Sequence, residues 1–253
     1  MTATLALWQK HMIKFWGHSE EALGTLLSPV LWVLLFGAGM GAVMAEGTAG
    51  IEDYTEFVAP GIISLTALTG AVVGGATLLD ERLRGIMKEY LVAPIPRISI
   101  IMGNMLSSVT KATLQSVVIL VVAALAGAGL TQNPLEVVLA LVLMATYSLG
   151  FVGLATAWAV RASSTGGYHA LIFLFNLPLL FASNALYPLD LLPRWLETLA
   201  RLNPTTYVID TLRHMLYGAD PVIAPALSAA VVVGFAAFGT AVGYWSFQRA
   251  MAT

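Results

Sequence analysis

Side chains that could catalyse a reaction are few and scattered in this sequence. The four histidines are His11, His18, His169 and His214. No two of them have the H-E-x-x-H spacing that places a pair of metal ligands on one helix face. The chain has no cysteine, which excludes thiolate catalysis, disulfides and Cys-ligated metals. The sequence therefore predicts no metal site and no catalytic residue.

Motifs for hydrolysis of a nucleotide or an ester are also missing. The Gly-rich cluster at residues 163–167 is followed by no lysine, and no G-x-x-x-x-G-K-[ST] pattern occurs in the chain. No G-x-S-x-G elbow is present. We interpret the cluster as a tight turn, and we expect no cofactor on this chain.

A relay of charges for ion-coupled transport is not apparent either. An ionisable residue at the bilayer centre costs ~2.5–3.5 kcal/mol and typically marks an ion pathway. Lys111 is the one charge clearly inside an apolar stretch, and we expect it to snorkel toward the nearer basic end. Energy for transport would therefore come from another chain.

The elements that must position any site are apolar helices. Of the 253 residues, 58% are hydrophobic and 10% are charged, whereas soluble domains carry about 25% charged residues. We therefore predict an all-α integral membrane protein with one domain, residues 1–253. Windows of ~20 apolar residues predict six transmembrane helices at residues 22–45, 57–79, 104–130, 135–160, 168–187 and 222–247. A net charge of −2 without a basic block argues against nucleic-acid binding.

Charges between these spans separate by sign. One side carries the basic residues Lys10, Lys14, Arg82, Arg84, Lys88, Arg97, Arg161 and Arg249. The other side carries the acidic residues Glu46, Glu52, Asp53, Glu56, Glu136, Asp190, Glu197, Asp210 and Asp220. Because basic loops stay in the cytoplasm, we expect both termini to be cytoplasmic.

The first 21 residues predict an amphipathic helix that lies in the membrane interface. Its apolar positions recur at helical spacing and are Leu5, Trp8, Met12, Phe15 and Trp16.

Residues 80–97, between the second and third predicted spans, combine dense charge with apolar side chains. Met87, Tyr90 and Leu91 share one helix face, while Arg84, Lys88 and Glu89 point elsewhere. Pro94 ends the helix, because a residue before proline disfavours the helical region. A solvated turn accounts for the arginines. The apolar ridge instead favours a short helix that docks in the groove of another protein.

Residues 188–220, on the opposite side, predict two short helices. Asp190 is a candidate cap for the first and Thr205 or Thr206 for the second. Asp210 is within one turn of Arg213 and His214, a spacing that allows an ion pair. Neither helix can cross ~30 Å of hydrocarbon. Both a re-entrant hairpin and a surface-lying loop fit this pattern.

Neutral polar and aromatic residues in the spans are candidates for a translocation pathway. Glycines such as Gly150 and Gly153 would let helices approach closely, and Pro178 predicts a kink. The candidate pathway residues are Thr66, Thr69, Phe173, Asn176, Phe181 and Asn184. These types suit an amphiphilic or lipid-like substrate, but they are equally common in helix packing.

Taken in order, these features resemble the permease subunits of ABC-2 type exporters, and they are similar to bacterial drug-export and nodulation-factor-export permeases. The resemblance covers nearly the whole chain. Its most specific parts are residues 57–61 (FVAPG), 89–97 (EYLVAPIPR), 187–189 (YPL) and 202–207 (LNPTTY).

The resemblance implies a complex in the bacterial inner membrane. Two copies of the chain would pair, through the first and fifth spans, and bind two copies of a P-loop ATPase that holds ATP and Mg²⁺. The coupling helix would lie at residues 84–94, with Arg84, Met87, Lys88, Glu89, Tyr90, Leu91 and Pro94 facing or shaping the ATPase contact. Residues 188–216 would form an external gate that includes Trp195, Asn203, Pro204, Tyr207, Asp210 and Arg213.

These inferences favour the membrane half of an ATP-driven exporter for an amphiphile such as a drug, a lipid or an oligosaccharide conjugate. Two other classes remain: an ATP-independent carrier or channel, and a membrane anchor that recruits an ATPase without transporting anything. Association with a soluble ATPase separates the exporter from the carrier, and substrate movement separates it from the anchor.

Overall fold

The computed structural model describes residues 3–45 and 54–251, and these residues form helices and connecting turns without a strand. The prediction of an all-helical chain is therefore confirmed. The helices are α1 (Ala3–Gly17), α2 (Ser19–Ala45), α3 (Tyr54–Leu83), α4 (Ile86–Val92), α5 (Arg97–Leu125), α6 (Pro134–Ala159), α7 (Thr165–Phe181), the 3-10 turn η1 (Leu189–Leu191), α8 (Arg194–Leu202), α9 (Pro204–Tyr217) and α10 (Pro225–Ala250).

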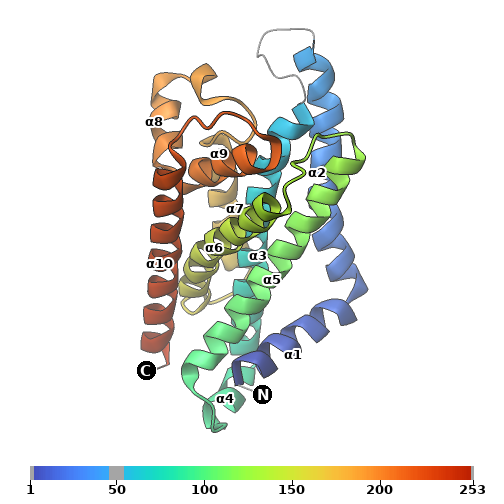
Figure 1. Ribbon diagram of the computed structural model, residues 1–253. Coiled ribbons are helices and arrows are strands. Elements are labelled where there is room, and N and C mark those ends of the chain that lie inside the picture. The colour runs from blue at the N-terminus through green and yellow to red at the C-terminus, as the bar shows by residue number, and fades with distance from the viewer. Residues whose placement is uncertain (1–2, 46–53, 252–253) are drawn as a thin grey trace.

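Four of the described helices, α3, α5, α6 and α10, are long and apolar enough to cross a membrane. The sharply bent pair formed by α1 and the first part of α2 gives a fifth if it counts as one span. The apolar helix α7 has 17 residues and falls below this length. Figure 1 shows the long helices side by side, with α8 and α9 at one end and α4 at the other.

The closest helix pairing joins α6 and α10 through glycines. The backbones approach where Gly150 and Gly153 of α6 face Gly239 and Gly243 of α10, so that a Cβ at any of the four would overlap the partner helix. Beside this contact, the rings of Phe151 and Phe235 meet edge to face with centroids 4.9 Å apart. The predicted close approach at Gly150 and Gly153 is confirmed, and its partner is α10.

Helix α5 differs from the predicted third span, residues 104–130. It begins at Arg97, seven residues earlier, and ends at Leu125. Polar groups in its first half are buried because other helices cover them: the Asn104 side chain donates to the Gly74 carbonyl of α3 at 3.0 Å. Gly127, with a φ of 100°, ends the helical path before the predicted boundary.

Helix α7 ends at Phe181, six residues before the predicted end of the fifth span. Pro178 lies inside its last turn, and the kink predicted at this residue stays a prediction. The carbonyls left open there are bound by side chains. Asn203 donates to the Leu179 and Ala182 carbonyls at 2.8 and 2.7 Å. Residues up to Tyr187 therefore follow as turns.

Helix α1 packs on the other helices along one side, and its predicted position in the membrane interface stays a prediction. Leu7, His11 and Phe15, spaced by four residues, are its buried positions, whereas Leu5 and Trp16 are exposed. Lys111 of α5 lies against this helix, which carries the predicted basic-side residues Lys10 and Lys14. It is 6% exposed, and its ammonium lies 4.7 Å from the centre of the Phe15 ring. The cation–π contact with α1 replaces solvation of the ammonium by water.

The ends of the helices carry opposite charge, as expected. At the α4 end, Lys10 pairs with Glu81, and Arg97 of α5 donates to the Met251 carbonyl after α10 at 3.2 Å. At the α8–α9 end, Glu56 accepts from the Gly129 backbone at 2.6 Å. The predicted acidic residues Glu46, Glu52 and Asp53 lie outside the described residues.

Candidate coupling site and external gate

A buried carboxylate at the α4 end joins three helices. Glu81, on α3, is 3% exposed. The ammonium of Lys10 on α1 donates to its Oε1 at 2.6 Å, and the hydroxyl of Tyr90 on α4 donates to the same oxygen at 3.1 Å. Lys10 also donates to the Tyr90 hydroxyl. Burial raises the pKa of Tyr90 above its ordinary value, although its hydrogen bond from Lys10 acts in the opposite direction. We call Lys10, Glu81 and Tyr90 the α4 anchor.

Helix α4 is a seven-residue element set off from α3 by a glycine turn. Gly85 adopts a φ of 81°, which favours glycine, and Ala93 returns to extended backbone before Pro94. Met87, Tyr90 and Leu91 lie in α4 at the predicted helical spacing, but the three side chains are not equally accessible to a partner. Met87 is buried and Tyr90 is half-buried, while Leu91 is exposed. The reason is that the α4 anchor turns the Met87–Tyr90 side toward α3.

The exposed surface of α4 is therefore mixed in character. It consists of Leu83, Arg84, Lys88, Glu89, Leu91, Val92 and Pro94. Val92 is 86% exposed. Arg84 forms a surface ion pair with Asp80, its Nε lying 2.7 Å from Oδ1.

A second connection at this end runs to α6. Arg82 follows Glu81 on α3, and its guanidinium donates to the carbonyls of Val160 and Ala162, at the end of α6. Cationic side chains suit the end of a helix, where carbonyls have no intrahelical partner. The last turn of α3 thus contacts α1, α4 and α6.

The opposite end is built from η1, α8 and α9, and its caps differ from those predicted. Asp190 lies within η1, and Pro193 precedes α8 without a side-chain cap. Asn203 caps α9, its Oδ1 accepting from the Thr205 backbone at 3.0 Å. Thr206 instead donates to the Ala200 carbonyl at 2.7 Å, which ties α9 to α8.

Arg213 of α9 connects three segments at this end. Its Nη2 donates to the Phe57 carbonyl of α3 at 2.9 Å and to the Asn184 carbonyl at 3.0 Å. The guanidinium also lies 3.9 Å from the centre of the Phe57 ring. Asp210 has other partners, accepting from the backbones of Val222 and Ile223 at 3.2 and 2.9 Å. Asp210 and Arg213, which were predicted to pair, thus each hydrogen-bond to a different part of the chain.

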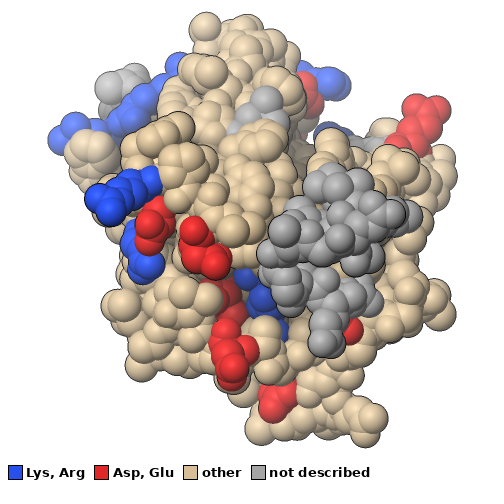
Figure 2. Space-filling model, turned by 90° about the horizontal axis from the view of Figure 1, so that it is seen from above, with Lys and Arg blue, Asp and Glu red and all other residues tan. Residues whose placement is uncertain are grey.

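A hollow of about 370 Å³ lies beside Arg213. Asp190, Glu197, Asp210 and Asp220 contribute four acidic side chains to its lining. Figure 2, which looks onto the molecule from above, shows acidic side chains gathered near the middle of this face. Two other predicted gate residues lie farther out: Trp195 is 66% exposed, and Tyr207 donates to the Arg201 carbonyl at 2.7 Å.

Sequence comparison identifies the family. Residues 2–217 match the model of a family described as ABC-2 type transporter. The chain belongs to the ABC-2 type transporter family. It is 31% identical over 218 residues to the transport permease ycf38 of Porphyra purpurea, covering 85% of this chain and 74% of that protein.

Relatives of this ABC-2 type protein include bacterial proteins. Nodulation protein J of Rhizobium leguminosarum bv. trifolii is 32% identical over 226 residues, with 87% of this chain and 82% of the relative covered. The multidrug ABC transporter permease YbhR of Escherichia coli (strain K12) is 26% identical over 166 residues, covering 64% and 44%. The resemblance inferred from residues alone is confirmed.

Candidate pathway residues of this ABC-2 protein do not converge on one surface. Thr66 is buried between α3 and α5, where its hydroxyl donates to the Ile63 carbonyl at 2.7 Å and lies 3.3 Å from the Ser116 hydroxyl. The Thr69 hydroxyl donates to the Leu65 carbonyl at 3.1 Å. Thr66 therefore contributes to the contact between α3 and α5, whereas the hydrogen bond of Thr69 stays within α3.

The remaining candidates lie on or after α7. Phe173 and Phe181 are 66% and 47% exposed, and Asn176 is partly exposed. Asn184 is buried near Arg213, and its Oδ1 has no hydrogen-bond partner among the described residues. A pathway lined by both the α7 surface and Asn184 would need additional residues to complete its lining.

Sequence reasoning missed two members of the sites. Glu81 was one charge among several in residues 80–97, and Phe57 was noted only in a motif. A signal existed for Glu81: it precedes Tyr90 by nine residues, across the Gly85 turn that reverses the chain direction. The partner Lys10 is 71 residues away in sequence, and only the packing of α1 reveals it.

Truncation of Arg213 is expected to destabilise the fold at the gate. Arg213→Ala leaves the buried Asn184 carbonyl without its donor and removes the contact with Phe57, a loss of ~1–3 kcal/mol. Arg213→Lys should recover only part of the lost stability, because the lysine ammonium cannot reproduce the planar set of donors of the guanidinium. Thermal unfolding of the purified protein in detergent measures both. Arg194→Ala, at an exposed position of α8, is the control, and an equal loss there would contradict the assignment.

Proposed function

We propose that this ABC-2 protein is the membrane permease of an exporter, driven by separate ATPase subunits. The observation that carries the proposal is the α4 anchor. It joins a short helix with an exposed, charged surface to α3 and α1 through one buried carboxylate. The sequence itself contains no P-loop motif. A docked ATPase would move α4, and the anchor would transmit that movement to the membrane helices.

The proposed complex contains two copies of the chain and two of a P-loop ATPase. Helices α2 and α7 carry exposed apolar side chains that suit contacts with lipid or with the second copy, among them Leu27, Leu35, Phe173 and Phe181. These helices correspond to the first and fifth predicted spans. We propose that α2 and α7 cross the membrane too, giving six crossings, with α8 and α9 as the re-entrant gate.

The orientation proposed places α4 in the cytoplasm of a bacterial cell. Lysine and arginine residues concentrate at the α4 end, and the positive-inside rule assigns that end to the cytoplasmic side. The substrate proposed is an amphiphile, such as a drug, a lipid or an oligosaccharide conjugate. Support comes from relatives named nodulation protein J and multidrug ABC transporter permease.

Co-expression with a candidate P-loop ATPase tests the proposal directly. The two proteins should co-purify from detergent, and vesicles containing both should accumulate an amphiphilic dye only with ATP. Co-purification without transport would favour the anchor, and transport by the chain alone would favour a carrier.

Reversal of one exposed charge on α4 is expected to weaken the ATPase contact. Glu89→Lys should lower ATP-dependent uptake about 5–150-fold, the range of a lost coupling free energy of ~1–3 kcal/mol, while membrane insertion stays normal. Dye uptake and the yield of co-purified ATPase report the two effects. Glu20→Lys makes the same change at an exposed position at the start of α2. Normal uptake by the Glu89 variant would show that α4 is not part of the ATPase contact.

A further inference from the structure

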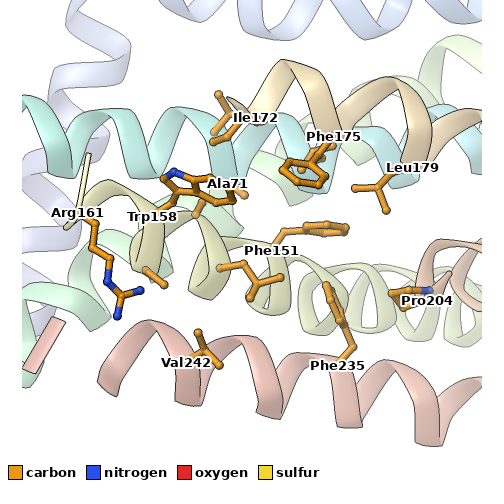
Figure 3. Close-up of a pocket in the computed structure, with 15 residues that line it drawn as sticks. Ala71, Phe151, Trp158, Arg161, Ile172, Phe175, Leu179, Pro204, Phe235 and Val242 are labelled. Atoms are coloured by element: carbon orange, nitrogen blue, oxygen red, sulfur yellow. The ribbon is translucent and has the colours of Figure 1, made fainter. Parts of the chain in front are cut away.

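A long apolar pocket lies among α3, α6, α7 and α10. Its volume is about 650 Å³, within the ~300–1,000 Å³ of pockets that hold small organic ligands. Figure 3 shows Phe151, Phe175 and Phe235, from three different helices, projecting into the same space. An apolar cavity offers water too few hydrogen-bond partners to be a favourable site. The pocket is therefore suited to an alkyl chain.

The pocket is elongated and runs toward both ends of the molecule. Arg161, just after α6, is at one end, and Pro204, the first residue of α9, is at the other (Figure 3). The Arg161 end is the α4 end, since Arg82 of α3 binds the carbonyls on both sides of Arg161. Trp158 lies near that end, its ring centroid 5.8 Å from that of Phe175. Tryptophan is enriched at the level of lipid headgroups.

A single charge marks the mouth of this pocket. Arg161 is the only ionisable residue among the described residues of its lining. Its side chain is exposed and has no ion-pair partner in the part of the chain that the structure describes. Three residues later, Ser164 caps the N-terminus of α7 by accepting from the Gly167 backbone at 3.1 Å. A helix N-terminus favours anions, which adds to the charge of Arg161.

We propose that the pocket holds one acyl chain of an anionic membrane phospholipid, whose phosphate is bound by Arg161. The apolar length of the pocket matches a chain aligned with the helices, and the cation at its mouth matches an anionic headgroup. A bilayer supplies such a lipid directly from the leaflet at the α4 end. This site is independent of the export role, because it requires neither an ATPase nor a transported substrate.

Native mass spectrometry of the purified chain in detergent tests the headgroup preference. Phosphatidylglycerol and phosphatidylcholine with identical acyl chains are added at equal concentration. The wild type is expected to retain about tenfold more phosphatidylglycerol, which corresponds to ~1.4 kcal/mol. Arg161→Gln should abolish this preference. Lys88→Gln removes a charge from exposed α4 and should preserve it. Equal retention of the two lipids by the wild type would overturn the proposal.

A second pair of variants tests the position of the chain. Val242 lines the pocket from α10, and Val242→Trp fills it. Val233→Trp adds the same volume to the same helix at a position that is 59% exposed. Retention of phosphatidylglycerol should fall only in the Val242 variant. Equal retention by both variants would refute a buried chain, and if Val242→Trp does not fold, the Arg161→Gln comparison decides.

Discussion

Replacement of Glu81 by alanine is expected to uncouple ATP hydrolysis from transport. The change removes the shared acceptor of Lys10 and Tyr90, so that the hydrogen bonds joining α3 to α4 and α1 at this point are lost. ATP-dependent uptake in vesicles should fall about 5–150-fold, the range of coupling free energies of ~1–3 kcal/mol. Binding of the ATPase should persist, because the exposed surface of α4 is unchanged. Uptake and co-purification are measured on the same preparations.

The neighbouring carboxylate provides the matched control for this prediction. Asp80 pairs with Arg84 on the surface, at 2.7 Å, with 29% of its side chain exposed. Exposed pairs of this kind contribute ~0–1 kcal/mol, so Asp80→Ala should transport nearly as well as the wild type. If both variants lose transport equally, the α4 anchor has no special role. Tyr90→Phe, which keeps the ring but removes the hydroxyl, should fall between them.

Gly153→Ala is expected to give the largest loss of stability among single methyl additions. The new Cβ would overlap the Gly239 carbonyl of α10, which is backbone and cannot move away independently. The two helices must separate, and overpacking of this kind costs ~1–3 kcal/mol, occasionally more. The expected result is a lower thermal unfolding midpoint in detergent and a reduced yield of monodisperse protein.

Gly234→Ala is the corresponding control on α10. A Cβ at Gly234 meets nothing within 4 Å, so alanine there adds helix propensity without a clash. Its unfolding midpoint should equal or exceed that of the wild type. An unchanged midpoint for the Gly153 variant would show that α6 and α10 can adjust their spacing, and the close glycine contact would then not determine stability.

Together these variants would separate two functions of the fold. The contact between α6 and α10 is a matter of packing and should affect transport only through stability. The α4 anchor is small and lies at one end, so its loss should alter coupling more than unfolding. Measuring both ATP-dependent uptake and thermal unfolding for each variant would distinguish a mechanical defect from a folding defect.

Much of the architecture follows from local sequence alone. Long apolar runs exclude a soluble domain, because such a chain has too few charged groups to cover its surface. Helices α3, α6 and α10 lie within a few residues of the predicted spans. Pro94 located the end of the α4 segment, since its restriction on the preceding residue is local. The family was also recognisable from four short motifs.

Tertiary structure decided which polar groups are buried and what they bind. Residue spacing placed Met87 and Tyr90 on a docking ridge, but Glu81 and Lys10 turn that side inward. Lys111 was expected to extend toward the basic end, but its burial against the Phe15 ring could not be read from spacing. Both outcomes depend on α1, a helix whose contacts are up to a hundred residues away in sequence. Hydropathy reports transfer from water to lipid and carries no information on which partner replaces the water.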